Sequence, residues 1–585
     1  MSPGLPPLKD KIHELALRNA IEHDGVARWE GILNRVLALY PELRSEGGET
    51  AKTVREEVQL VNDLSAEEKQ RQWKALPSPS EAVSAAGAEK ASGDTRGQGD
   101  QPRMLPPLLG AEQGKVVLRF APFPSGALHI GSARGIFLND AYRQMYHGKF
   151  YIVFDDTVGS EEKRPIIEAY DLIREDLAAA AVTPDAYFYK SDRMDLYYRH
   201  LPSLLEKRAA YVCFCPGEVL KKRREIGEAC PERDQPVDWQ LQKWGEMLDG
   251  KYGEGEAVVR LKTDMKHPNP AFRDRVLFRI SKFNHPRVGN KYCVWPMLEY
   301  AFAIDDVELG VTHVLRGKDL VMEDMMETAI WDILGLKGPA MLHWGILRVR
   351  DAKISKSKSY MEVKNGTYDG WSDPRTWSFS SLARRGIRPE AIRGFVMSFG
   401  MSLADIEVPA ETLYAENRRL LDPVTERRSF VANAGILKVD WFPPEIHSVN
   451  LANHPDKTEL GTRTISIGDG RFFLPLKDLE KQKGKEIRLK DLVNVQLPPT
   501  IGPSETVAKF TTRANKPIQR IQWVPEEGAV PVSVLMVDGT RVEGMGEPSL
   551  AEVKEGDIYQ FERFGFVRAD KQDGSSTRKF VFGHP

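Results

Sequence analysis

Residues 116–134, VVLRFAPFPSGALHIGSAR, decide the fold of this chain. The apolar run 116–120 is typical of a strand, the Pro- and Gly-rich residues after it are typical of a tight turn, and residues 128–146 are typical of a helix. A second strand is expected at 150–154. The order strand, turn, helix, strand predicts a unit of a Rossmann-type parallel sheet, with the helix N-terminus at the carboxyl edge of the sheet.

The turn and the start of the helix carry groups that suit a nucleotide. Free backbone N–H groups at a helix N-terminus attract phosphate, and His129 can donate a hydrogen bond to it. Gly126 and Gly131 lack the Cβ that would keep a flat base away. The candidate nucleotide-binding residues are therefore Pro124, Ser125, Gly126, His129 and Gly131. Taken alone, these residues also fit an ordinary βαβ corner with a surface histidine.

A second segment distinguishes the two interpretations. A strand-like run at 343–349 leads into KISKSKS (353–359), which is small, hydroxylated and cationic. Two such segments in this order resemble the HIGH and KMSKS signatures of class I aminoacyl-tRNA synthetases. The resemblance implies that Lys353, Ser355, Lys356 and Ser357 bind ATP. It also implies that His129, Lys353 and Lys356 are the catalytic groups.

Activation of an amino acid suits these groups. The attacking carboxylate is already ionised, so the barrier lies in aligning it with the α-phosphorus and in neutralising charge as pyrophosphate leaves. Fixed cations, backbone N–H groups and Mg²⁺ bound with ATP can do this work. A loop flanked by Gly and Ser can close over the triphosphate and open again for release.

The bulk composition bounds the class of protein. A length of 585 residues predicts several domains of roughly 100–200 residues each. Hydrophobic residues at 41% and charged residues at 28% are typical of a globular protein. The net charge of −2 argues against binding of nucleic acid by a positive charge spread over the whole protein surface. Any contact with RNA must therefore use local basic surfaces. With four cysteines, no apolar leader and no membrane-spanning stretch, we expect a cytoplasmic protein, and a monomer.

Apolar spacing and composition divide the chain into segments. Residues 29–40 carry an apolar stripe at helical spacing, and residues 65–68 form a capping-box start of a further helix. The later part of the chain alternates short β-rich runs with turns, which favours antiparallel barrels. We expect a helical bundle at 1–76, a flexible linker at 77–103, the first half of a Rossmann-type catalytic domain at 104–198, an α/β insert at 199–294, the second catalytic half at 295–365, a helical connector at 366–421 and antiparallel β-barrels at 422–585.

Further motifs lie along the chain at RFAP (119–122), FDDT (154–157), RGKD (316–319), DGWSDPR (369–375), HPDKTELGTRT (454–464) and QFERFGF (560–566). Together they resemble the glutamyl-tRNA synthetases of the archaeal type, whose body is built like that of glutaminyl-tRNA synthetases. The resemblance implies an insert that binds the tRNA acceptor stem, barrels that bind the anticodon, and glutamate activation that waits for tRNA. Phe123 and Ser132 depart from the usual first motif, and Phe123 puts the fit around the ATP site in doubt.

The same resemblance implies which residues bind the amino acid. Arg119 matches an arginine that binds the side chain of the substrate amino acid in relatives. Asp155 matches a residue that binds the α-amino group of the substrate. Trp295 lies where glutamine enzymes use a tyrosine in recognition. Arg316 lies where glutamate-type members keep an arginine and glutamine-type members lack one. A guanidinium grips a carboxylate through two charge-assisted hydrogen bonds, whereas an unpaired buried guanidinium disfavours neutral glutamine. We therefore expect L-glutamate and tRNA-Glu as substrates, and charging of tRNA-Gln stays open.

Other functions remain as alternatives at this point. The nearest is a glutaminyl-tRNA synthetase. A non-catalytic tRNA-binding paralogue would keep the fold, but the intact His129, Lys353 and Lys356 argue against it. A small-molecule adenylyltransferase with the same nucleotide fold would not explain the C-terminal β-rich segment.

A metal site is suggested by three cysteines. Cys213 and Cys215, followed by Cys230, resemble the start of a zinc cluster found in the insert of some relatives. The spacing of four ligands is incomplete, so Asp234 or the distant His267 would have to complete the site. Free thiols are the alternative, and they are the commoner case for an incomplete motif.

Overall fold

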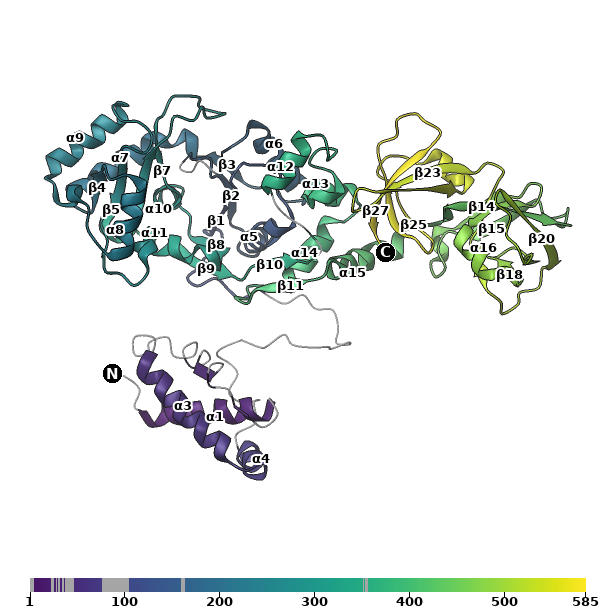
Figure 1. Cartoon of the computed structure of the whole chain (residues 1–585), viewed down its shortest axis with the longest axis horizontal. Helices are drawn as coiled ribbons and strands as arrows, with labels where there is room; N and C mark the ends of the chain where they lie inside the picture. Colours follow the sequence, from purple (N-terminus) through teal and green to yellow (C-terminus); the bar gives the residue numbers. More distant parts are fainter. Residues whose placement is uncertain are drawn as a thin grey trace. The chain divides into compact units, whose positions relative to one another are not determined.

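The computed structural model describes residues 5–22, 26–27, 29, 32–33, 36, 47–75, 105–158, 164–350, 352 and 356–585. The chain divides into two compact units, Met1–Asp100 and Gln101–Pro585 (Figure 1). The predicted linker at 77–103 lies outside the described residues. Within the described part of the chain, no helix has both the length and the apolar character needed to cross a membrane.

The N-terminal unit is helical where it is described. It contains α1 (Leu5–Glu22), α3 (Gly47–Asp63) and α4 (Ala66–Ala75). Ile12 and Leu15 of α1 are buried in one cluster with Val54 and Val58 of α3. Before α4, the Glu68 N–H donates to Ser65 Oγ at 3.3 Å and the Ser65 N–H donates to Glu68 Oε2 at 3.3 Å, which is the expected capping box. Of the predicted stripe at 29–40, Ile32 and Val36 are buried in the same cluster and Trp29 and Leu33 pack against it, whereas Leu37 and Tyr40 lie outside the described residues.

A parallel sheet forms the centre of the larger unit. Among the described residues its five strands follow the order β3 (Ala186–Tyr189), β2 (Lys149–Phe154), β1 (Val117–Phe120), β8 (His313–Gly317) and β9 (Ala340–Trp344). All of these strands pair in parallel, and the prediction of a Rossmann-type sheet is confirmed. The chain runs outward from β1 to β3 and then returns to β8 on the other side of β1. Ligands of such sheets bind at the carboxyl ends of strands at this reversal point.

Helices connect the strands of this sheet. The 3-10 helix η2 (Ile130–Ser132) leads into α5 (Ala133–Tyr146) between β1 and β2, and α6 (Ile167–Ala179) lies between β2 and β3. On the other side, α10 (Leu298–Glu308) precedes β8, and the 3-10 helix η6 (Lys318–Leu320) with α11 (Val321–Leu334) follows it. The predicted helix N-terminus after the first strand is therefore present.

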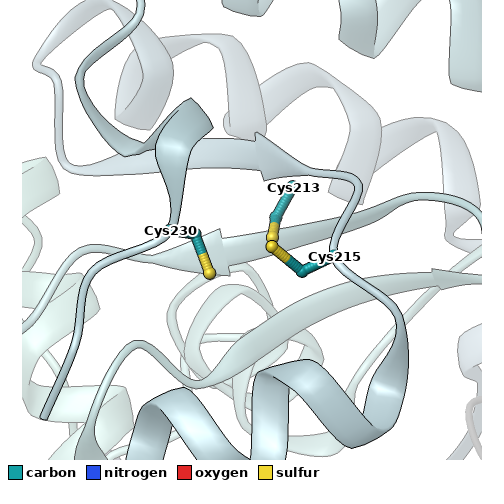
Figure 2. A group of neighbouring side chains, drawn as sticks. All are labelled: Cys213, Cys215 and Cys230. Atoms are coloured by element: carbon teal, nitrogen blue, oxygen red, sulfur yellow. The ribbon is translucent and has the colours of Figure 1, made fainter.

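The segment between β3 and β8 holds a second, antiparallel sheet. Its strands are β4 (Ala210–Cys213), β5 (Val258–Leu261), β6 (Val276–Ile280) and β7 (Val294–Pro296), which pair in that order. The helices of this segment are α7 (Met194–Glu206), α8 (Gly217–Ile226) and α9 (Val237–Leu248). Strand β4 ends at Cys213, close to Cys215 and Cys230 (Figure 2).

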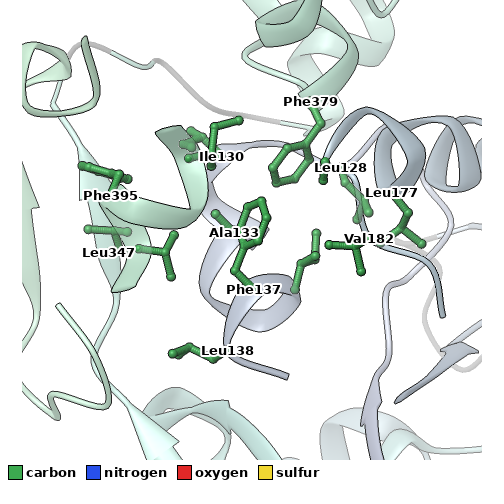
Figure 3. Packing of buried hydrophobic residues seen from close by; sticks show 14 of the residues in the cluster. Leu128, Ile130, Ala133, Phe137, Leu138, Leu177, Val182, Leu347, Phe379 and Phe395 are labelled. Atoms are coloured by element: carbon green, nitrogen blue, oxygen red, sulfur yellow. The ribbon is translucent and has the colours of Figure 1, made fainter. Parts of the chain in front are cut away.

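The core of the larger unit joins the first motif to helices that follow much later in the chain. Figure 3 shows Phe137 of α5 facing Phe379, and the two rings meet edge to face with centroids 6.1 Å apart. Ile130, Leu347 and Phe395 belong to the same buried cluster. The later helices are α12 (Lys356–Lys364), α13 (Phe379–Arg384), α14 (Pro389–Met397) and α15 (Ala410–Leu421).

The run at 343–349, expected to be one strand, is two. Strand β9 ends at Trp344, and β10 (Leu347–Val349) pairs with β11 (Ile406–Val408) instead of the main sheet. The break lies at Gly345, whose N–H donates to Ser402 O at 2.9 Å. A Cβ at Gly345 would lie only 2.0 Å from Ala404 O, so the close approach requires glycine. A contact with a distant segment therefore turns the chain out of the sheet.

The C-terminal part of the chain is rich in β-structure, as expected. Two sheets there have seven described strands each, and most pairs are antiparallel. The sheets are mixed and not purely antiparallel, because pairs such as β14 with β20 and β23 with β27 are parallel. One sheet has the order β12 (Arg427–Arg428), β25 (Ile558–Phe561), β26 (Gly565–Ala569), β27 (Arg578–His584), β23 (Val530–Leu535), β24 (Arg541–Gly546) and β13 (Phe430–Ala432). The other has the order β21 (Arg520–Ile521), β18 (Glu486–Leu489), β19 (Asn494–Gln496), β20 (Glu505–Thr512), β14 (Ala434–Asp440), β17 (Arg471–Pro475) and β22 (Val524–Pro525), and β15 (Ser448–Ala452) pairs separately with β16 (Thr462–Ser466).

Candidate active site

The turn after β1 is held by its own backbone and by a distant tryptophan. The Ser125 N–H donates to Phe123 O at 3.0 Å, and the Ile166 N–H donates to Pro124 O at 3.0 Å. Gly126 has a φ of 149°, and a Cβ there would lie 2.4 Å from Cη2 of Trp371. Both the backbone angle and the contact require glycine, so this turn is built for Gly126.

His129 caps the 3-10 helix η2. Its Nδ1 accepts a hydrogen bond from the Gly131 N–H at 3.1 Å. With Nδ1 as the acceptor, the neutral ring carries its proton on Nε2, which is then the group able to donate to a phosphate. A Cβ at Gly131 would lie 2.8 Å from His129 Cε1, so the glycine makes room for the ring in this orientation.

The second motif begins beside the first. Strand β10 packs against η2. Arg134 of α5 is buried and donates to Gly345 O and Gly400 O, both at 2.5 Å, which ties α5 to the segment just before β10. Burial without a carboxylate partner lowers the pKa of Arg134 to about 10, so it stays charged. Lys353, Ser355 and the side chains of Lys356 and Ser357 lie outside the described part of the chain, and their roles stay predictions.

Arg119 and Arg316 lie on the two central strands and line one cavity of about 160 Å³. Phe302, Leu315 and Trp344 also line it. The cavity lies at the reversal point between β1 and β8, where the fold class places its ligands. The two arginines predicted to meet the substrate side chain are thus brought together, and both are buried.

Both guanidiniums already have partners within the chain. Arg119 binds Asp306 in two places, from Nε to Oδ1 at 2.6 Å and from Nη2 to Oδ2 at 2.7 Å. Its guanidinium also lies 4.1 Å from the ring centroid of Phe302. Arg119 is therefore a paired guanidinium in this structure, and its partner is buried rather than at the surface. Asp306 is a residue that the sequence reasoning missed, although a pair of carboxylates at the end of an apolar helical run was visible.

Arg316 is held by two acids of α11. Its Nη1 and Nη2 donate to the two oxygens of Glu327, each at 2.9 Å, and Nη2 also contacts Asp324. The Nε of Arg316 is buried and has no hydrogen-bond partner among the residues that the structure describes. Burial raises the pKa of Glu327 above the ordinary value of a glutamate, and the charge of Arg316 opposes this shift. Glu327 was also missed from the sequence, where it is one of four acids in the helix α11.

Asp155 lies beside this cavity but does not line it. Its Oδ1 accepts from Nζ of Lys190 at 2.8 Å, and Lys190 is fully buried. The same ammonium lies 3.3 Å from the ring centroid of Phe302, which does line the cavity. Trp295 is fully buried in the core of the inserted segment, with its ring stacked 5.2 Å from that of His285. The structure therefore does not bring Trp295 into the cavity wall.

Three cysteines meet in the inserted segment (Figure 2). The Sγ atoms of Cys213, Cys215 and Cys230 all lie within 4.8 Å of one another. The pKa of Cys230 is lowered to about 6, chiefly by a hydrogen bond from Cys213 and in part by the charge of Arg260. Nη1 of Arg260 donates to Cys230 Sγ at 2.8 Å. Cys230 is therefore mostly a thiolate at neutral pH, which is the form that binds metal.

The expected fourth ligand is not in this group. Asp234 pairs with Nζ of Lys262 at 2.7 Å, and the ring of His267 contacts the backbone of Asn269. Among the described residues, the carboxylate in contact with the cluster is that of Glu232, whose Oε2 lies 3.9 Å from Cys215 Sγ. The three thiols fit three positions of a tetrahedral zinc site, and Glu232 is the side chain placed to reach the fourth.

A second cavity lies in the C-terminal part of the chain. It measures about 170 Å³ and is lined by Arg463, Lys490, Gln522, Trp523 and Glu562, among others. Gln522 is buried, and its Nε2 has no hydrogen-bond partner within the described part of the chain. The cavity offers aromatic and amide groups together with two cations, of which Lys490 pairs with Glu562 and Arg463 pairs with Glu547.

Comparison with known proteins agrees with this geometry. A family model described as the catalytic domain of class I tRNA synthetases (E and Q) matches residues 115–423, and two models of anti-codon binding domains of the same class match residues 425–512 and 520–570. Three curated relatives are glutamate–tRNA ligases. The ligase of Pyrococcus furiosus is 42% identical over 95% of this chain and 96% of its own length. The ligase of Pyrococcus abyssi is 42% identical over 96% of this chain and 97% of its own length. That of Methanosarcina mazei is 38% identical over 98% of both chains.

The catalytic match begins just before β1 and ends just after α15, so it includes the strands that carry both arginines. The identities extend over nearly the full chain, and they confirm the resemblance that the motifs indicated. The chain belongs to the class I tRNA synthetases of the glutamate and glutamine group.

Proposed function

We propose that this chain is a glutamate–tRNA ligase, which activates L-glutamate with ATP to glutamyl-adenylate and transfers it to the 3′ end of tRNA-Glu. The observation that carries the proposal is the cavity between β1 and β8, with the buried Arg119 and Arg316 in one wall. The printed names of the archaeal relatives support the same assignment.

ATP is assigned to the turn and helix after β1. Pro124, Ser125, Gly126 and Gly131 shape the path of the backbone, and Nε2 of His129 donates to the phosphates. The N–H groups at the start of the helix add a fixed positive field. Mg²⁺ bound with ATP supplies the remaining neutralisation of the triphosphate charge.

The second motif completes this assignment. Lys353 and Lys356, with Ser355 and Ser357, are assigned to the triphosphate, supported by the position of β10 beside η2. These cations would bind the developing pyrophosphate charge more strongly than the ground state, which is what accelerates the step.

Glutamate is preferred because of the donors in the cavity. The buried Nε–H of Arg316 can meet a carboxylate oxygen, and Arg119 adds charge across the cavity. A glutamine amide would place N–H groups where only acceptors are useful. Asp155 is assigned to the substrate ammonium, which would share this carboxylate with Lys190. Trp295 acts only indirectly in this proposal, through its packing against His285.

The remaining segments are assigned to tRNA binding and to the organisation of the domains. Residues 199–294 would bind the acceptor stem and residues 422–585 the anticodon, supported by the cationic and aromatic cavity near Trp523. Residues 1–76 are proposed as an appended helical domain and 366–421 as a connector.

The four cysteines, all within the described residues, are free thiols, which supports a reducing compartment such as the cytoplasm. Nothing in the proposal needs more than a monomer.

Zinc is proposed as a structural ion of the inserted segment. Cys213, Cys215 and Cys230 would hold it, with Glu232 as the fourth ligand. The ion would fix the end of β4 to the 3-10 helix η4 (Pro231–Asp234) that follows Cys230. It has no part in the chemistry of activation.

The test is charging of purified tRNA-Glu and tRNA-Gln, each with glutamate and with glutamine. The proposal predicts that glutamate is charged onto tRNA-Glu and that glutamine is not charged. Efficient charging of glutamine would favour the glutaminyl-tRNA synthetase instead. Tight tRNA binding without charging of either amino acid would favour a non-catalytic paralogue. The tRNA-Gln arm decides whether glutamate is also placed on that tRNA.

A further inference from the structure

One turn of the inserted segment reaches the end of strand β2. His285 and Gly289 close this turn, which lies between β6 and β7, because the backbone N–H of each donates to the carbonyl of the other, at 3.1 and 2.8 Å. The ring of His285 is buried, and its Nε2 lies 2.9 Å from the backbone oxygen of Asp156. A contact between residues 129 positions apart thus joins the inserted segment to the neighbour of Asp155.

The hydrogen bonds of the ring fix which nitrogen donates. Nδ1 of His285 accepts from the N–H group of Arg287 at 3.2 Å and from that of Val288 at 3.3 Å. An accepting nitrogen carries no proton, so the proton of the ring is on Nε2, which donates to the Asp156 carbonyl. One nitrogen of His285 therefore builds the turn, and the other holds the end of β2.

The end of β2 is held by other elements as well. Asp156 is fully buried, and its carboxylate accepts from the N–H and the hydroxyl of Ser191, at 2.8 and 2.7 Å, and from the hydroxyl of Tyr170 at 2.9 Å. The Asp155 N–H donates to Pro122 O in the turn after β1, at 3.1 Å. His285 adds a link from the inserted segment, and this link acts on the backbone. A buried carbonyl that loses its donor must move or stay unsatisfied.

Trp295 supports the ring of His285 from the other side of the inserted segment. The indole is fully buried in β7 and is stacked on the imidazole, with centroids 5.2 Å apart and planes at 24°. Nε1 of Trp295 has no hydrogen-bond partner among the residues that the structure describes, so packing places this side chain. Trp295 thus acts on β2 through His285, although it does not reach the cavity.

We infer that His285 is a positioning residue of the amino-acid site, which holds the backbone of Asp156 so that the carboxylate of Asp155 is aligned with the ammonium group of the substrate. This inference rests on the proposed function, which assigns Asp155 to that ammonium group. His285 acts through Asp156 and does not line the cavity. The Asp155 carboxylate is only one residue from the held carbonyl, and a charge-assisted hydrogen bond depends on alignment.

Two variants separate the two functions of the ring. In His285→Asn, Oδ1 can replace Nδ1 as the acceptor within the turn, but the shorter side chain ends before the Asp156 carbonyl. In His285→Gln, the side-chain amide can still donate to that carbonyl. The KM for glutamate in pyrophosphate exchange, with saturating tRNA-Glu, should rise roughly tenfold in His285→Asn because the bond to the ammonium group is weakened. The KM for ATP and kcat should change little, and His285→Gln should recover most of the wild-type KM for glutamate.

His454→Asn is the matched control. Nδ1 of His454 accepts from the Asp456 N–H at 3.0 Å, and Nε2 lies 2.9 Å from Asp422 O, so this buried ring has the same pattern of contacts in the C-terminal part of the chain. His454→Asn should leave the KM for glutamate at the wild-type value. The control separates the loss of a buried hydrogen bond in general from the loss of the bond to Asp156.

A second variant tests the support from Trp295. Trp295→Phe keeps a ring but reduces the stacked area, so it should raise the KM for glutamate less than His285→Asn does. In the His285→Asn background it should raise this KM no further, because both residues act on the same carbonyl. If His285→Asn does not fold, Trp295→Phe decides alone, and an unchanged KM for glutamate overturns the inference.

Three other results would overturn the inference. The first is a wild-type KM for glutamate in folded His285→Asn. The second is an equal rise in His285→Asn and His285→Gln, and the third is a rise in the KM for ATP as large as that for glutamate, because both would show a general loss of structure. These outcomes leave the proposed function intact if the wild type charges glutamate. A wild type that charges glutamine instead would refute the proposed function.

Discussion

Gly131→Ala should disable His129 while leaving that residue itself unchanged in the sequence. In the structure, a Cβ at position 131 would lie 2.8 Å from Cε1 and 2.9 Å from Nδ1 of His129. Ordinary contact needs about 3.4 Å or more, so the ring must move by roughly 0.6 Å, or turn away. The hydrogen bond from the Gly131 N–H to Nδ1, now 3.1 Å, would be strained or lost with it.

The size of the effect follows from the role assigned to the ring. A catalytic group misplaced by ~1 Å can cost on the order of 100-fold in rate. A shift of about half that size, with loss of the bond that fixes the tautomer, should lower kcat for pyrophosphate exchange by roughly 10- to 100-fold, or about 1.4–2.7 kcal/mol. The KM for glutamate should change little, because the amino acid cavity lies between β1 and β8.

The experiment includes two controls. Gly245→Ala places a Cβ in a helix where nothing lies within 4 Å, so it should leave exchange unchanged and slightly stabilise α9. In a His129→Ala background, Gly131→Ala should have almost no further effect on kcat. The reasoning would be refuted if the Gly131→Ala variant had the kcat of the wild type for pyrophosphate exchange. It would also be refuted if Gly131→Ala lowered kcat in the His129→Ala background as much as it does in the wild type.

Three further predictions concern other parts of the chain. Lys356→Ala should abolish exchange while tRNA binding, measured by filter retention, stays nearly unchanged; loss of both together would contradict the assignment to phosphate. Cys230→Ser should reduce zinc content, measured by atomic emission, and lower the melting temperature, whereas an equal metal content in both proteins would reject the zinc site. Burial raises the pKa of Asp176 to about 6, so its contribution to folding is fully present below pH 3.8 and is lost as the pH rises through 6. Relative to Asp176→Asn, the wild-type free energy of unfolding should therefore fall by roughly 2–3 kcal/mol between pH 3.8 and 6, and a constant difference in urea unfolding would contradict this.

Local patterns predicted the first motif well. The strand, turn and helix at 116–146 depend on features within a few residues of one another, such as the apolar run before Pro122 and the glycine at 126. The capping box at Ser65 is equally local. Such elements could be placed from the sequence because their causes lie in the same stretch.

Long-range contacts explain most of what the sequence did not predict. The single strand expected at 343–349 is broken by contact of Gly345 with Ala404, 59 residues later. Arg119 pairs with Asp306, which is 187 residues away. Spacing along the chain carries no information on such partners. The arginines of the cavity were found from the resemblance, whereas the acids that hold them were visible only once the strands were assembled.

The order of strands in the main sheet has a consequence for synthesis of the protein. Strand β8 fills the place beside β1, but it is made only after the whole segment that contains β4 to β7. A growing chain therefore exposes one open edge of β1, with Arg119 in water and without its acidic partner, while that segment is made. Closure of the cavity between β1 and β8 is thus a late event in biogenesis, and the nascent chain is vulnerable to misassociation until α10 and β8 emerge from the ribosome.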